Sequence, residues 1–337
     1  WLVYGILLAV MTLFIAGCAN KWKTSGKIAM GQKRWDKAIS DLQKALEMDP
    51  GDGEAHFLIA KSYKESGEFE SMISHLDAAD SSWSKGEEKI GELREQTWRK
   101  LLELGEREEN NEKYEQARDN YTLAIAIFPE RFEAYAKAGF VWQLLDNYDS
   151  TYFYYGEAYR LEPEKIGVLE GLAGLCYNMG KSDRADSLYA KILEKDPENT
   201  AALLTRGAIA AENEDYTAAV DFYTRALDLE SDNCDLWFRV GVVYFREMKN
   251  NEEAINAFLR AKELCPDDAN PRINLNVVLL TMERFDEVIA NLETFTLDFP
   301  DECVGWDLYS QALLRKGMRK QALEAANKYE ECEGAKQ

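Results

Sequence analysis

Hydrophobic residues recur along this chain at spacings of three and four residues, which is the pattern of one face of an α-helix. Apolar stretches of this kind alternate with short polar turns, and the whole arrangement repeats. Pro129, Pro163 and Pro197 are 34 residues apart, and Pro266 and Pro300 follow with one residue of slippage. A fixed period of this length predicts a solenoid of helical repeats, whereas a generic helical bundle needs no fixed period.

Small and large residues occupy fixed positions within each 34-residue unit. The units begin at Ala19, Gly53, Trp98, Phe132, Ile166, Thr200, Cys234, Ala269 and Cys303. Small residues fill the eighth position, at Gly26, Ala60, Gly105, Gly139, Ala173, Gly207 and Gly241, while large ones such as Trp237 and Tyr223 fill the fourth and twenty-fourth. Small residues let two helices approach closely, and a proline beyond the second helix ends it. Each unit is therefore predicted to be a helix–turn–helix packed against its neighbours.

This pattern resembles the tetratricopeptide repeat family. The family's marks stand at Tyr135, Gly139, Trp142, Tyr148, Tyr155, Ala158 and Pro163. The resemblance covers about nine units, from Ala19 to Glu331, and implies an all-α fold, a right-handed superhelical solenoid. Asn276 departs from the pattern at an eighth position. About eleven extra residues follow the second unit, so we expect a lengthened helix or an irregular joint there, and this joint is the best candidate for a subdomain boundary.

The expected organisation has five parts. They are a leader over residues 1–17, units one and two over 18–80, the joint over 81–97, units three to nine over 98–331, and a tail over 332–337. The leader is uncharged and ends in Ile15-Ala16-Gly17-Cys18, which resembles the lipobox of bacterial lipoprotein precursors. The resemblance implies a signal peptide, acylation of Cys18 and, because Ala19 follows, an outer-membrane location facing the periplasm. The alternative is an uncleaved membrane-spanning helix, since about 20 apolar residues cross a bilayer.

Charge and composition exclude several classes of function. The chain has 61 acidic and 40 basic residues, a net charge of −21, and no block of basic residues. This argues against binding to nucleic acid and against docking of the repeats on anionic lipid. His56 and His75 lack a catalytic partner set, and the glycines stand singly at repeat positions rather than in a phosphate loop. We therefore expect no enzyme activity, no metal and no cofactor.

Four of the six cysteines bracket two units. Cys234 opens the seventh unit and Cys265 nearly closes it, and Cys303 and Cys332 do the same for the ninth. Because the two helices of a unit run antiparallel, we predict the disulfides Cys234–Cys265 and Cys303–Cys332. Packed helix axes about 8–10 Å apart are a geometric obstacle, so four unrelated small residues remain the alternative. Cys176 is expected to be a free core thiol.

The resemblance also implies where a partner would bind. In the family, positions 2, 5, 6, 9, 12 and 13 of each first helix face a concave groove. The corresponding candidates are Leu204, Ala208, Phe238, Arg239, Val242, Phe245, Arg246, Ile273, Asn274, Val277 and Leu280. Aromatic residues flanked by arginine are typical of interface hot spots. The alternative is that some of these residues pack internally.

Two functions follow from these observations. The first is a lipid-anchored scaffold of the bacterial cell envelope, which holds other envelope proteins by a peptide or helix in its groove. The second is a helical-repeat lipoprotein of nutrient or glycan uptake that binds a small ligand. Such proteins usually carry an extra irregular domain, and here the repeats occupy the chain.

Overall fold

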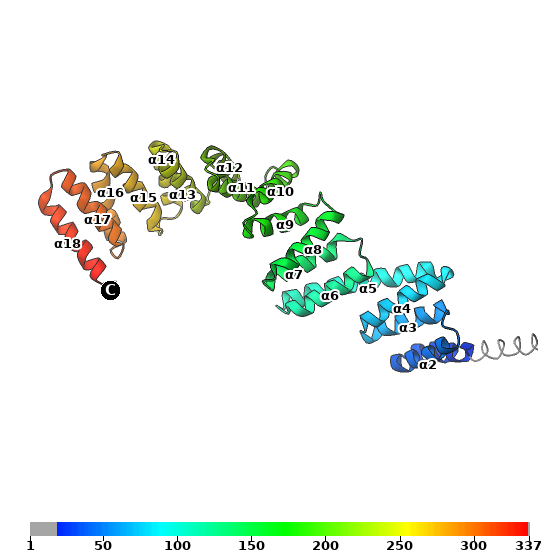
Figure 1. Cartoon of the computed structure of the whole chain (residues 1–337). Helices are drawn as coiled ribbons and strands as arrows, with labels where there is room; N and C mark the ends of the chain where they lie inside the picture. Colours follow the sequence, from blue (N-terminus) through cyan, green and yellow to red (C-terminus); the bar gives the residue numbers. More distant parts are fainter. Residues whose placement is uncertain (1–18, 336–337) are drawn as a thin grey trace, which may run out of the picture. The chain divides into compact units, whose positions relative to one another are not determined.

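The computed structural model describes residues 19–335, which are all-α and contain no β-strand (Figure 1). Helical residues 19–31 and α2 (Trp35–Met48) form the first repeat. The first and second helices of the later repeats are α3 (Gly53–Ser66) and α4 (Phe69–Ser82), α5 (Glu87–Asn110) and α6 (Tyr114–Ile127), α7 (Phe132–Leu144) and α8 (Tyr148–Leu161), α9 (Ile166–Asn178) and α10 (Ser182–Lys195), α11 (Thr200–Glu212) and α12 (Tyr216–Leu229), α13 (Cys234–Val242) and α14 (Asn251–Leu264), α15 (Ala269–Thr281) and α16 (Phe285–Asp298), and α17 (Cys303–Arg315) and α18 (Arg319–Ala335).

The chain divides into two compact units, Trp1–Leu175 and Cys176–Gln337, which are described separately below. The division falls inside α9. The segment 81–97, which the sequence suggested as a boundary, lies inside the first unit instead. There a short 3₁₀ turn, Ser84–Gly86, leads directly into α5, which is 24 residues long. The extra residues therefore lengthen a helix, and its buried residues Ile90 and Leu93 join the core formed with α4 and α6.

The turn between the two helices of a repeat has a constant backbone conformation. Its fifteenth residue has a positive φ at Lys33, Gly67, Glu112, Asp146, Gly180, Glu214, Glu283 and Gly317. A left-handed residue costs an L-amino acid roughly 1–2 kcal/mol and glycine almost nothing. Only Gly67, Gly180 and Gly317 follow that preference, so the remaining repeats adopt the turn because helix packing on both sides imposes it.

The seventh repeat contains one extra residue, and a π-helical turn absorbs it. Val243–Glu247 continues α13 as a π-helix, and the left-handed residue moves to the sixteenth position, at Lys249. In the sixth repeat, the Asp215 amide donates to the carbonyl of Ala210, five residues earlier. In the seventh, the Asn250 amide reaches six residues back, to Tyr244. The slippage in the proline spacing therefore arises within a helix, where a single inserted residue commonly forms a π-bulge.

In the third, fourth, sixth and seventh repeats, the glycine at the eighth position lies directly beneath an aromatic ring. A Cβ atom added at Gly207 would stand 2.4 Å from Cε1 of Tyr223, and one added at Gly105 would stand 2.4 Å from Cε1 of Tyr121. The rings are buried, and burial raises the pKa of both tyrosines. In the eighth repeat Leu292 occupies the ring position.

Asn276, the exception at an eighth position, belongs to this same repeat, and its Oδ1 is buried without a hydrogen-bond partner among the described residues. Its side chain is buried, and its Nδ2 donates to the carbonyl oxygen of Arg272 at 2.8 Å.

The fourth residue of a repeat ties the helix start to the preceding turn. Trp237 Nε1 donates to the carbonyl oxygen of Ser231, and Trp306 Nε1 donates to that of Pro300, both at 3.1 Å. His56 Nε2 stands 3.1 Å from the carbonyl oxygen of Pro50, so this nitrogen must carry the proton. The unprotonated Nδ1 of His56 then accepts from Nδ1 of His75 at 2.9 Å. Burial together with the neighbouring His56 lowers the pKa of His75.

Substitution at the eighth position tests this packing. Gly207→Ala should lower the free energy of unfolding by up to about 2 kcal/mol, because overpacking against the Tyr223 ring costs about 1–3 kcal/mol and is offset by a helix-propensity gain of about 1 kcal/mol. Gly91→Ala is the control, since no atom lies within 4 Å of its added Cβ. That control should stabilise the protein by about 0.5–1 kcal/mol. Urea unfolding measures both, and equal stabilisation by the two substitutions contradicts the ring contact.

Candidate functional site

A hollow of about 370 Å³ opens on the first helices of the second compact unit. We call it the groove hollow. It is lined by Tyr177, Leu204, Thr205, Ala208, Tyr223, Asn233, Asp235, Leu236 and Arg239. These residues come from the end of α9, from α11 and α12, and from the start of α13. Its size falls at the lower end of the roughly 300–1,000 Å³ typical of ligand pockets.

The groove hollow lies where the repeat register places the groove. Leu204, Ala208 and Arg239 are residues that the sequence named as candidates, and the structure brings them together here. Tyr177, Thr205 and Asp235 also line the hollow and were not among the predicted residues. They occupy the twelfth, sixth and second positions of their repeats, so the same positional rule identifies them.

Some polar side chains in the groove hollow have hydrogen-bond partners and others do not. The Tyr177 hydroxyl donates to Oε1 of Glu212 at 2.9 Å, and burial and this hydrogen bond raise the pKa of Tyr177. Burial also raises the pKa of Tyr223, against the opposing charge of Arg239. The side chain of Arg239 is exposed and makes no hydrogen bond or ion pair with the described residues. The site thus combines a half-buried apolar wall with an available guanidinium.

Two local features hold the start of α13 in place. Asn233 caps the helix, because its Oδ1 accepts from the amide of Leu236 at 3.0 Å. A disulfide joins Cys234, the first residue of α13, to Cys265 with a Cα–Cα distance of 6.0 Å. Cys265 stands at the C-cap of α14, beyond the regular helix, which brings the two Cα atoms closer than packed helix axes. Asp235, Leu236 and Arg239 project from this fixed turn.

The second disulfide joins Cys303 to Cys332 with a Cα–Cα distance of 5.6 Å. Both pairings are those that the sequence proposed. Cys176 is a buried free thiol, and burial raises its pKa.

The π-helical turn contributes a second, smaller hollow beside the first helices. This side hollow measures about 360 Å³ and is lined by Phe245, Arg246, Lys249, Asn251 and Thr281. Lys249 Nζ donates to the main-chain carbonyl of Arg246. The guanidinium of Arg246, like that of Arg239, is exposed and has no hydrogen-bond or ion-pair partner among residues 19–335.

The other predicted groove residues are not open surface. Phe238, Val242, Ile273, Val277 and Leu280 are partly buried and pack against the core of the last repeats. Phe238 lies 5.7 Å, between ring centroids, from the fully buried Phe258. Asn274 Nδ2 donates to the carbonyl oxygen of Asn270. For these residues, internal packing accounts for much of the apolar surface that the sequence pattern assigned to the groove.

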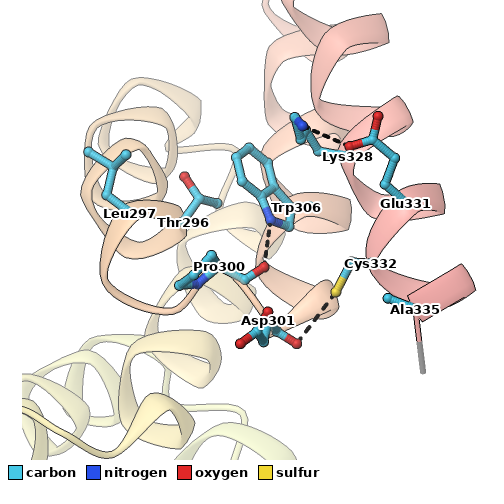
Figure 2. Close-up of a pocket in the computed structure, with 9 residues that line it drawn as sticks. All are labelled: Thr296, Leu297, Pro300, Asp301, Trp306, Lys328, Glu331, Cys332 and Ala335. Carbon is cyan, nitrogen blue, oxygen red and sulfur yellow. Dashed lines mark hydrogen bonds and ion pairs between the residues drawn. The ribbon is translucent and has the colours of Figure 1, made fainter.

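A larger hollow of about 660 Å³ lies near the C-terminus. Figure 2 shows the residues that line it. It lies between the end of α16, the start of α17 and the end of α18. Trp306 forms one wall, and the Lys328–Glu331 ion pair of 2.7 Å forms another. Leu297 at its edge is 77% exposed. This terminal hollow uses no groove position of α15 or α17 and presents no unpaired cation.

In the part of the chain that the structure describes, we find no arrangement of side chains typical of a catalytic site or a metal site. Residues 19–335 contain no cluster of three or more His, Cys, Asp or Glu side chains placed to hold a metal ion. His56 and His75 are engaged with each other, as described above.

Comparison with known proteins identifies the repeats. Residues 29–80, 176–233 and 235–268 match family models described as tetratricopeptide repeat. The chain contains tetratricopeptide repeats. Repeats of this family generally form non-catalytic scaffolds that bind other proteins or peptides. A crystal structure of a tetratricopeptide repeat protein from Parabacteroides merdae shares the fold, with a TM-score of 0.50, 17% identity and coverage of 71% of this chain and 93% of that one.

Two curated relatives span the tetratricopeptide region. The human protein O-mannosyl-transferase TMTC3 is 24% identical over 77% of this chain and 22% of its own length. A BBSome complex member, the BBS4 homologue of Drosophila melanogaster, is 21% identical over 76% of this chain and 53% of its own length. The chain thus spans about half or less of these relatives. The transferase name belongs to the relative and not to this chain.

Cys18 and the rest of the leader lie outside the described residues. Within the described residues, no helix combines the length and apolar character that crossing a membrane requires.

Removal of the disulfide that closes the seventh repeat provides a test of this site. The double substitution Cys234→Ser with Cys265→Ser should lower the free energy of unfolding by about 3–4 kcal/mol, since the bond closes a loop of about 30 residues in the unfolded chain. Denaturation by urea, with and without a thiol reductant, measures the change. The wild type should lose stability on reduction more than the double variant does. An equal response of both proteins argues against this bond.

Proposed function

We propose that this tetratricopeptide chain is a protein-interaction scaffold that binds a peptide or helical segment in the groove hollow. The observation that supports it is positional. One hollow of about 370 Å³ is lined by groove positions of three successive repeats. Tyr177, Leu204 and Asp235 each come from a different one of these repeats. A hollow that draws on several repeats is suited to an elongated ligand that crosses them, such as an extended peptide or an amphipathic helix.

The chemistry of the hollow supports a macromolecular ligand. Leu204, Ala208 and Leu236 supply apolar lining, and Tyr177 and Arg239 add polar groups to it. Tyrosine and arginine around an apolar centre are the residue types that dominate binding energy at interfaces. Each half-buried side chain can lose its remaining exposure when a partner covers it, and that loss of apolar exposure favours binding.

We extend the proposal to a cellular location. Acylation of Cys18 would anchor the scaffold in the bacterial envelope, at the outer membrane and facing the periplasm, where it would hold other envelope proteins. Two observations favour this. Small residues precede Cys18 as in a lipobox, and two disulfides close repeats of the second unit. Disulfides persist in oxidising compartments such as the bacterial periplasm.

Site-specific photo-crosslinking tests groove binding. A benzoylphenylalanine side chain at Leu204 should crosslink to a defined segment of a partner protein in cells. The same probe at Leu229, which is 42% exposed on α12, is the matched control and should give no such product. Substitution of Phe238 by a charged residue is a poor alternative, because it would disrupt the contact with Phe258. Equal crosslinking at both positions would place the binding surface elsewhere.

Lipid labelling tests the anchor. Wild-type chain should incorporate radiolabelled palmitate and fractionate with membranes, whereas Cys18→Ala should lose both properties, because the thioether acceptor is removed. Cys176→Ser is the control and should keep the label, since that thiol is buried in the repeats. If Cys18→Ala stays in the membrane fraction, the leader is a spanning helix and the lipoprotein proposal is wrong.

A further inference from the structure

Positive charge is concentrated in the first repeat of this acidic chain. Residues 19–37 contain six basic residues and one acidic residue, a net charge of +5. Residues 1–18 are uncharged, so the chain after residue 37 carries −26, the difference between −21 and +5. The acidity of the whole chain argues against docking of the repeats on anionic lipid, but it does not describe this segment.

Three of these cations meet at the turn of the first repeat. A hollow of about 430 Å³ there is lined by Lys33, Arg34, Trp35, Asp36, Lys37 and Ser66. We call Lys33, Arg34 and Lys37 the basic turn. All three are exposed, and none forms an ion pair with another described residue. Asp36 offsets one of the three charges, and the remaining excess favours a ligand that carries phosphate groups.

The repeat fold does not require the basic turn. Its residues occupy positions 15, 16 and 19 of the 34-residue unit. The sixth repeat has Glu214, Asp215 and Ala218 at these positions, and no other repeat is basic at all three. These cations therefore belong to the first repeat in particular and not to the helix packing that all repeats share.

Two of the six cations are neutralised within the protein. Lys23 Nζ lies 2.8 Å from Oδ2 of Asp52, and Lys27 Nζ lies 2.7 Å from Oε1 of Glu54. Both carboxylates stand at the start of the second repeat. The cations of this segment that remain open to an external ligand are Lys21 and the basic turn.

The helix over residues 19–31 has an exposed face that leads toward the basic turn. Lys21, Thr24 and Ile28 are exposed on it. Spacings of three and four residues place them on one side of the helix. Ile28 is 58% exposed, which is unusual for a large apolar side chain outside an interface. A cation and an apolar side chain on one face are the combination that binds a membrane interface.

The preceding sequence indicates what would cover this surface. Residues 1–18 contain the apolar run of the proposed anchor. Whether Cys18 is acylated or the leader spans the bilayer, Ala19 then starts at a membrane surface. The helix over 19–31 is about 20 Å long. The basic turn at its far end reaches the same surface when this helix lies along the membrane.

Resting on the proposed membrane anchoring, we infer that the first repeat docks on an anionic phospholipid surface through Lys21, Ile28 and the basic turn. Lipid phosphate groups bind the guanidinium of Arg34 and the ammonium groups beside it. Ile28 enters the boundary between headgroups and acyl chains. The same lipids repel the acidic remainder of the chain, which confines docking to this repeat.

Lysine acetylation of the full chain reconstituted in vesicles tests this inference. One vesicle type contains phosphatidylethanolamine and phosphatidylglycerol, and the other contains phosphatidylcholine in place of phosphatidylglycerol. Lys33 and Lys37 should react at least about fivefold more slowly in the anionic vesicles, since each cation gains about that preference for such a surface. Concentrated salt should abolish the difference. Lys316 and Lys320 in the ninth repeat are the internal control and should react equally in both.

Charge reversal gives a second readout in the anionic vesicles. The triple variant Lys33→Glu with Arg34→Glu and Lys37→Glu should raise the acetylation rate of Lys21 to that in neutral vesicles, while the chain stays in the vesicle fraction. The turn tolerates glutamate at position 15, because Glu214 has the same left-handed conformation in the sixth repeat.

A matched variant controls for the change in net charge. Arg315→Glu with Arg319→Glu and Lys320→Glu makes the same change at the turn of the ninth repeat and should leave Lys21 protected. If both triple variants expose Lys21 equally, protection follows the net charge of the chain and the docking surface is wrong.

The remaining outcomes separate this inference from the proposed anchoring. If the chain is recovered with both vesicle types and Lys33 reacts equally in them, the inference is wrong and the anchor stands. If the chain is recovered with neither, both are wrong. If Lys33 is protected in native envelope membranes but not in vesicles of their extracted lipids, a protein covers the basic turn and the lipid inference is wrong.

Discussion

The close approach of two helices at a glycine, beneath an aromatic ring, is the contact on which the third, fourth, sixth and seventh repeats depend. The ring of Tyr223 covers Gly207 so closely that even a methyl group would meet it, and Phe258 covers Gly241 in the same way. Because the ring fills the space beside the missing side chain, the two helices pack without a void. This contact fixes the angle at which each first helix meets its neighbours. Residues on the opposite side of α11 and α13 are thereby placed on a common groove surface.

The turn and the helix respond differently to that constraint. Lys33, Glu112 and Glu214 adopt a left-handed conformation that their side chains disfavour, which shows that packing overrides local preference at the turn. In the seventh repeat the chain has one residue too many. The ring contact is kept, since Phe258 has moved from the twenty-fourth to the twenty-fifth position and still covers Gly241. The π-helical turn Val243–Glu247 takes up the difference, next to Phe245 and Arg246 at the groove.

Much of this architecture could be predicted from the sequence. The 34-residue period, the small residues at fixed positions and the prolines all indicate the same repeating pair of helices. The proline slippage near Pro266 signalled the extra residue, but sequence spacing alone could not say whether a loop or a helix would contain it. At the candidate site, the positional rule predicted Leu204, Ala208 and Arg239, which line the groove hollow together. It could not separate an open groove residue from Phe238 or Val277, since both kinds of residue follow the same helical spacing and differ only in how the neighbouring core reaches them. The pairing state of a surface arginine likewise depends on three-dimensional neighbours.

The two disulfides have a consequence for how the chain would bear mechanical load. A solenoid pulled from its ends unravels repeat by repeat, because each repeat contacts only its neighbours. The bonds Cys234–Cys265 and Cys303–Cys332 enclose sequence separations of 31 and 29 residues. Each closed loop withholds about 100 Å of extended chain from stretching. Under tension, the Cys234–Cys265 disulfide would keep the two helices of the seventh repeat joined after neighbouring repeats without a disulfide had unfolded.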